Sequence, residues 1–125
     1  MLTTIATVLA GLVGAAVILM GARALWAPQD AAGFGIPDTP TESPTFRAWL
    51  AVKSVRDVSA GIVILAVLAG GTAHLLGWAL LAATVIPVGD AVIVLRSGGP
   101  KAVAYGVHAA TAAVMLVISL LLLLA

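Results

Sequence analysis

Four ionisable side chains, among others, lie deep within long stretches of sequence that are mainly apolar. Arg56 and Asp57 are adjacent in one stretch, Asp90 lies in the next, and His108 lies in the last. Carboxylates and imidazoles can move protons, and a guanidinium can hold an anionic headgroup. Ionisable groups within a membrane mark function by default, because an unpaired charge there is costly. We therefore take Asp57, Asp90 and His108 as candidate catalytic groups.

Further polar and aromatic side chains share helix faces with these groups. Lys53 lies four residues before Asp57, a spacing that places both on one face of a helix. Tyr105 and Thr111 each lie three residues from His108. These faces supply the candidate ligand-binding residues, which are Lys53, Arg56, Trp49, Tyr105 and Thr111.

The composition indicates that membrane helices position these residues. Of 125 residues, 62% are hydrophobic and 9% are charged, and the mean hydropathy is +1.21. A soluble domain has about 25% charged residues, so this chain cannot cover a water-facing surface. A net charge of +1 provides no basic field for nucleic acid, and the absence of cysteine excludes thiolate metal sites. We expect an integral protein of the cell membrane, with the lipid bilayer as its surroundings.

Four apolar runs are long enough to cross a bilayer, which takes about 20 helical residues. We expect an all-α fold, an integral membrane four-helix up-down bundle that forms a single domain over residues 1–125. Ser43 before Pro44 is typical of a helix start, as is Thr72. The predicted spans are about 2–24, 46–69, 73–95 and 101–124, with a long loop at 27–45.

Basic residues predict which side of the membrane each connection faces. Antiparallel threading places every lysine and arginine toward the loop at 27–45 and the turn near residue 98. The positive-inside rule makes that side cytoplasmic, so both termini are predicted outside the cytoplasm. We do not expect the first run to be a secretory signal peptide, because no lysine or arginine lies before it and Arg23 follows it.

The long loop and two ridges of small residues carry further expectations. Phe34 and Ile36 favour a segment that folds back onto the mouth of the bundle, and a plain mobile loop is the alternative. Small residues at helical spacing indicate close helix packing, and either ridge could instead serve a homo-oligomer. The ridges are Ala10, Gly11, Gly14 and Gly21 in the first span and Ala102, Gly106, Ala109 and Ala113 in the fourth.

The buried charges predict a polar pocket in the cytoplasmic half, lined by the second, third and fourth spans. Asp57 and Asp90 are the expected partners of Lys53 and Arg56. A structural charge network that only fixes helix register is the alternative. The sequence contains no closely spaced pair of metal-ligating histidines, and no pattern identifies a cofactor.

Three motifs resemble those of a known family. They are Lys53–Gly61 (KSVRDVSAG), Ile86–Ala91 (IPVGDA) and His108–Ala112 (HAATA). They are similar to the second-, third- and fourth-helix motifs of domain-of-unknown-function family 4267, a family of small four-span membrane proteins. The resemblance implies that Arg56, Asp57, Asp90 and His108 are family features, and it supplies no reaction. A more distant architectural likeness is to the DoxX-like membrane proteins.

Three functions from different classes fit these features. The first is binding or converting a lipophilic small molecule, with its polar head at Arg56 and a carboxyl or His108 moving a proton, as in an isomerase, cyclase or quinone-type reaction. The second is a structural or accessory membrane subunit. The third is a small proton-coupled transporter, which the charge-free first span and the apolar outer half disfavour. Whether the chain is an enzyme stays open at this point.

Overall fold

The computed structural model describes all 125 residues, and every regular element in it is a helix. Two of the eight elements are not α-helices, because η1 is a 3-10 helix and η2 is a π-helix. The elements are α1 (Leu2–Trp26), η1 (Pro28–Phe34), α2 (Pro44–Gly70), α3 (Ala73–Ala83), α4 (Val85–Arg96), α5 (Lys101–Val103), η2 (Ala104–Ala109) and α6 (Ala110–Leu124).

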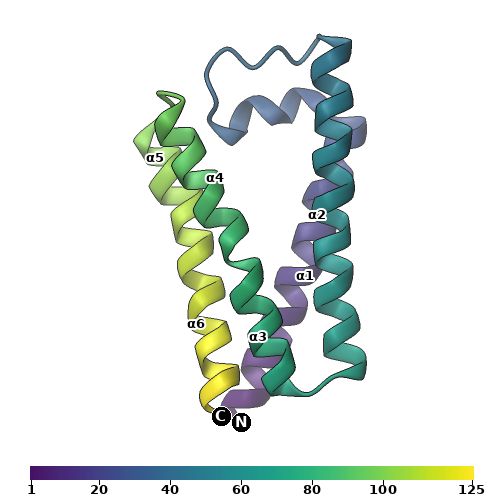
Figure 1. Cartoon of the computed structure of the whole chain (residues 1–125), viewed down its shortest axis with the longest axis vertical. Coiled ribbons are helices and arrows are strands. Elements are labelled where there is room, and N and C mark those ends of the chain that lie inside the picture. Colours follow the sequence, from purple (N-terminus) through teal and green to yellow (C-terminus); the bar gives the residue numbers. More distant parts are fainter.

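The long helices run along the longest axis of the molecule, and both termini lie together at one end (Figure 1). The helix η1 crosses the opposite end. Helix α2 packs mainly against α1 and also against α3, whereas α4 packs against η2 and α6. Helices α2 and α4 stand apart in the half of the molecule that lies away from the termini, and they make few direct contacts (Figure 1).

Three helical stretches are long and apolar enough to cross a membrane, namely Leu2–Trp26, Ala73–Arg96 and Lys101–Leu124. Helix α2 has 27 residues and so has sufficient length, but its first half carries several charges. Large apolar side chains cover the outer faces of all these helices, and only 22 of the 125 residues are buried. Such a continuous apolar exterior suits contact with lipid rather than water.

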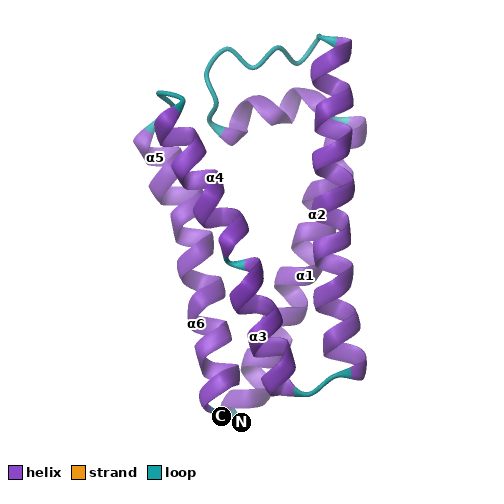
Figure 2. Cartoon of the chain, viewed as in Figure 1, coloured by secondary structure: helices purple, strands orange, loops and turns teal.

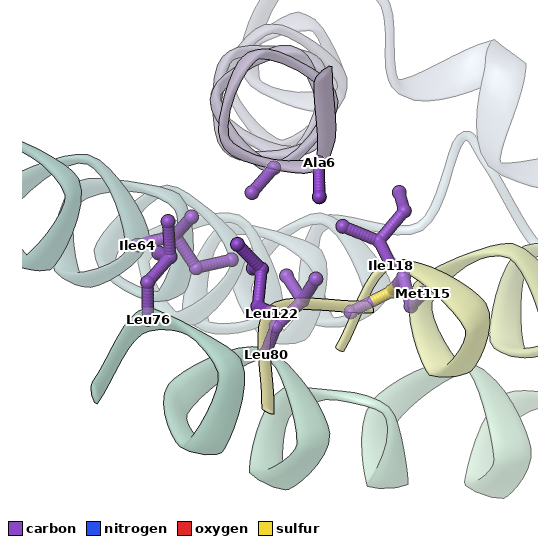
Figure 3. Close-up of a cluster of buried hydrophobic side chains, with 8 residues drawn as sticks. Ala6, Ile64, Leu76, Leu80, Met115, Ile118 and Leu122 are labelled. Atoms are coloured by element: carbon purple, nitrogen blue, oxygen red, sulfur yellow. The ribbon is translucent and has the colours of Figure 1, made fainter. Parts of the chain in front are cut away.

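The hydrophobic core lies toward the end that holds the termini, where four helices meet (Figure 3). One side-chain hydrogen bond joins two helices in this apolar region: the buried Ser119 hydroxyl of α6 donates to the Gly77 carbonyl of α3 over 2.9 Å. The core side chains are Ala6 and Ala10 of α1, Ile64 of α2, Leu76 and Leu80 of α3, and Met115, Ile118 and Leu122 of α6. Charged residues are therefore left to the opposite half.

Small residues bring α1 and α2 together, as predicted for the first ridge. A Cβ added at Gly61 would lie 2.5 Å from Ile18 Cγ1 and 2.6 Å from the Gly14 carbonyl oxygen. A Cβ added at Gly21 would lie 2.9 Å from Asp57 Cβ. The ridge predicted in the fourth span is different, because a Cβ at Gly106 would have no atom within 4 Å. At Gly106, therefore, the predicted ridge of the fourth span does not pack against another helix of this chain.

The segment before α2 folds back onto the helices, and we call residues 28–36 the strap. Gly35 adopts a left-handed conformation with φ of 108°, and a Cβ there would lie 2.9 Å from Val103 and 3.0 Å from Val94. A Cβ at Gly99 would collide with the Gly35 carbonyl oxygen. The strap therefore docks on the turn between α4 and α5, which confirms the expectation of a folded-back segment.

Candidate functional site

The start of α2 sets which of its side chains face the rest of the molecule. Ser43 Oγ accepts a hydrogen bond from the Phe46 amide over 3.3 Å, and Pro44 occupies the first turn. Close packing on α1 then fixes the rotation of the helix, because Ser54 is buried against α1 near Gly21. The charged stripe of α2, which consists of Lys53, Arg56 and Asp57, lies beside this contact, because Asp57 approaches Gly21 whereas Lys53 and Arg56 are exposed.

A break between α3 and α4 positions the other wall of the site. Pro87 has no amide hydrogen, so the Ala83 carbonyl loses its ordinary helical partner. Thr84 lies at the break, and its hydroxyl donates to the Leu80 carbonyl over 2.9 Å. The interruption is visible in Figure 2, and beyond it α4 continues away from α2. The break thus opens space between the two helices.

An open pocket of about 480 Å³ occupies this space. Four of its lining residues are charged and the other three are apolar, and they come only from α2 and α4. The lining residues are Trp49, Val52, Lys53, Arg56 and Asp57 of α2 and Ile86 and Asp90 of α4. Five of these seven are predicted site residues, which the fold brings together from two separate motifs.

The charges in the pocket are unequally partnered. Lys53 Nζ donates to Asp57 Oδ2 over 2.5 Å, one helical turn away. The side chains of Lys53 and Asp57 are 45% and 23% exposed. Arg56 forms no ion pair, so it lacks the carboxylate partner that we expected. Asp90 instead lies near His108, with Oδ2 4.0 Å from Nδ1.

His108 lies behind Asp90 and is 8% exposed. It belongs to η2, and single π-helical turns occur frequently at functional sites. Its Nε2 lies 2.8 Å from the Phe34 carbonyl oxygen, and its ring centroid lies 4.5 Å from that of Phe34. The histidine therefore links the strap to α4.

Two predicted ligand-binding residues lie apart from this group. Tyr105 is 58% exposed, and the exposed Thr111 donates its hydroxyl hydrogen to the Val107 carbonyl over 2.7 Å. Neither lines the pocket. The fourth predicted span therefore contributes only His108 to the neighbourhood of the pocket, and from behind Asp90.

Phe34 contacts two of the predicted site residues, although the sequence placed it only at the mouth of the bundle. Besides its two contacts with His108, its ring lies under Lys53, whose Nζ is 5.3 Å from the ring centroid. A lone aromatic residue in a proline-rich connection was the available signal. No cluster of three or more histidine or acidic side chains that could hold a metal ion is present.

The fold and the site together have the features of a helical membrane protein, with long apolar helices, a lipid-suited exterior and polar groups gathered in one half. Residues 14–122 match the family model described as Domain of unknown function (DUF4267), and the chain belongs to this family. The match includes all three motifs on which the resemblance rested. No curated protein and no solved structure matches the chain.

Proposed function

We propose that the protein crosses the cell membrane four times as an up-down bundle and binds a lipophilic small molecule between α2 and α4. In this proposal α2 spans the membrane in addition to the three long apolar helices, both termini lie outside the cytoplasm, and the pocket lies in the cytoplasmic half. The observation that carries the proposal is Arg56, a pocket-lining cation without an ion-pair partner in a chain that has few charges.

The packing of α2 supports its assignment as a span. It lies against α1 from Gly21 to Gly11, because glycines of α1 meet Asp57, Ile64 and Leu68 of α2 in succession. Because α1 is long and apolar enough to cross a membrane, a helix packed along it in this way reaches similar depths. Its charged stripe then faces the pocket, and its remaining exposed surface is largely apolar.

The chemistry of the pocket supports an amphiphilic ligand. The Arg56 guanidinium offers parallel N–H donors that match a carboxylate or a phosphate. Trp49, Val52 and Ile86 give the same pocket an apolar lining for the remainder of the molecule. Because α2 and α4 make few contacts, a ligand can enter between them from the lipid, without passing through water. Asp90, with His108 behind it, supplies groups that could transfer a proton to a bound ligand.

A second candidate, an accessory subunit of a larger membrane assembly, is favoured by the exposed small-residue face around Gly106. That face offers a close approach to another helix. In this case the Lys53–Asp57 pair would serve only to neutralise two charges on the same face of α2. The two candidates differ in whether the purified chain retains a small molecule.

The test is mass spectrometry of small molecules retained by gently purified protein. Wild type, Arg56→Gln and Arg47→Gln are compared, and Arg47 is the control because it is an arginine of the same helix that pairs with Glu42 outside the pocket. We expect one defined lipophile in wild type and in Arg47→Gln and its loss from folded Arg56→Gln. Equal retention by all three variants, or none by folded wild type, would contradict ligand binding at this pocket.

A further inference from the structure

The contact between His108 and the strap determines where the histidine carries its proton. A carbonyl oxygen can only accept a hydrogen bond, so the 2.8 Å contact with Phe34 requires a hydrogen on Nε2. The other ring nitrogen, Nδ1, then holds a lone pair in the neutral imidazole. The bond joins residues 74 positions apart in the chain, so it depends on the whole fold.

The free nitrogen faces a second group that can only accept. Nδ1 lies 4.0 Å from Asp90 Oδ2, and a carboxylate has no hydrogen to donate. Two acceptors that face each other in a partly buried place repel unless a proton lies on one of them. The gap is longer than a hydrogen bond, but a small side-chain rotation or one bridging water closes it, as is common in sites without ligand.

We propose that Phe34 is a positioning residue, whose main-chain carbonyl fixes the Nε2-protonated form of His108 so that Nδ1 and Asp90 Oδ2 share one exchangeable proton at the wall of the pocket. The proton lies on Nδ1 or on Oδ2 and moves between them. A bound ligand can exchange this proton with Asp90, because Asp90 lines the pocket. His108 does not line the pocket and holds the proton on the other side of Asp90. The sharing of the proton does not depend on the proposed function. Only the transfer of this proton to a bound ligand rests on it.

The fold holds the Phe34 carbonyl in place from three sides. The Phe34 ring packs on the imidazole with centroids 4.5 Å apart, and the Lys53 ammonium lies over the Phe34 ring, 5.3 Å from its centroid. The left-handed Gly35 follows directly and is enclosed by Val94 and Val103. A larger residue at Gly35 would therefore displace the carbonyl.

Three other charged groups, Lys53, Arg56 and Asp57 of α2, line the same pocket as Asp90. The one charged residue of the strap, Asp30, pairs with Arg23 instead. Lys53 contacts both Asp57 and the Phe34 ring. A ligand that draws Lys53 away from the ring would loosen the strap on the same histidine, which couples pocket occupancy to the position of the proton.

The test is nitrogen NMR of ¹⁵N-histidine-labelled full-length protein in lipid nanodiscs. The chain contains two histidines, and they provide opposite references. His74 Nε2 accepts a hydrogen bond from the Trp78 indole over 3.1 Å, so neutral His74 carries its hydrogen on Nδ1. A His74→Gln variant leaves only the His108 signals and completes the assignment.

We expect His108 Nε2 to be protonated at every pH, with Nδ1 bare or protonated. A spectrum in which Nε2 of His108 is bare in a sizeable fraction of molecules would overturn the inference. In Gly35→Val the displaced carbonyl should allow both neutral forms. Phe34→Ala is the milder variant if Gly35→Val does not fold: it loses the ring contacts that hold the carbonyl in place, so a smaller fraction of the other neutral form should appear. Asp90→Asn should move the His108 Nδ1 resonance at constant pH, because the group that shares its proton is removed, and an unchanged resonance would refute proton sharing.

The same samples separate this inference from the proposed function. Retention of a lipophile by a protein whose His108 carries its hydrogen on Nδ1 would leave ligand binding intact and reject the role of Phe34. An Nε2-protonated His108, with an Nδ1 resonance that depends on Asp90, in a protein that never retains a ligand would support the role of Phe34 and reject ligand binding.

Discussion

Replacing Gly61 by alanine should disturb the α1–α2 interface that turns the charged stripe of α2 toward the pocket. The added Cβ would lie 2.5 Å from Ile18 Cγ1, about 0.9 Å short of an ordinary van der Waals contact, and 2.6 Å from the backbone oxygen of Gly14. A backbone atom cannot rotate away, so the helices must separate. Overpacking of this kind costs about 1–3 kcal/mol.

Gly89→Ala is the matched control for this substitution. Gly89 also lies inside a helix, but no atom lies within 4 Å of the position of its added Cβ. Both variants gain about 1 kcal/mol because alanine favours a helix more than glycine does. We therefore expect Gly89→Ala to be more stable than wild type and Gly61→Ala to be less stable than Gly89→Ala by about 1–3 kcal/mol.

Reversible unfolding in mixed detergent micelles, followed by circular dichroism, measures this difference. Comparing the two variants with each other removes the contribution of helix propensity and leaves the packing at Gly61. A difference below about 0.5 kcal/mol, smaller than overpacking produces, would refute a close approach of α1 and α2 at this point. The orientation of the α2 charged stripe would then need another cause.

Two further predictions concern polar contacts. Ser119→Ala should destabilise the protein by about 1 kcal/mol, because a buried hydrogen bond to Gly77 is lost. The exposed Thr111→Ala should change the unfolding free energy by less than about 0.5 kcal/mol in the same assay, and equal effects would argue against the α3–α6 contact. A double-mutant cycle with Lys53→Met and Asp57→Asn should give a coupling of about 0.3–0.5 kcal/mol, because the two residues are one helical turn apart and the Lys53 side chain is 45% exposed. A coupling well above about 1 kcal/mol would contradict this exposure.

Local signals in the sequence predicted two helix starts and one ion pair. Ser43 and Thr72 both accept hydrogen bonds from the amide three residues later, as their types and positions indicated. The helical spacing of Lys53 and Asp57 predicted their ion pair, and the structure contains it. Such features depend on residues within one or two turns, so single-sequence reasoning can reach them.

The remaining features depend on contacts between distant parts of the chain. The Phe34–His108 hydrogen bond arises from the docking of the strap, which no local pattern specifies. Tyr105 was grouped with His108 on the assumption of regular α-helical spacing. The π-helix η2 winds more widely, with hydrogen bonds to the fifth residue, so residues three apart no longer share a face.

The partners of individual charges also could not be predicted. Arg56 and Asp90 were expected to take part in one network because their depths along the helices agree. The break at Thr84 instead moves α4 away from α2, and Asp90 lies beside His108 while Arg56 has no carboxylate partner. Side-chain pairing therefore follows from the separation of two helices, which depends on tertiary packing.

Photo-crosslinking with a diazirine-bearing fatty acid tests most directly whether a lipophile occupies the space between α2 and α4. The protein is irradiated in nanodiscs, and the modified positions are mapped by peptide mass spectrometry, with and without excess unlabelled fatty acid. The account predicts that competed labelling concentrates on the pocket residues Trp49, Val52 and Ile86. Labelling spread evenly over the exposed apolar faces of α1 and α6, and insensitive to competitor, would contradict it.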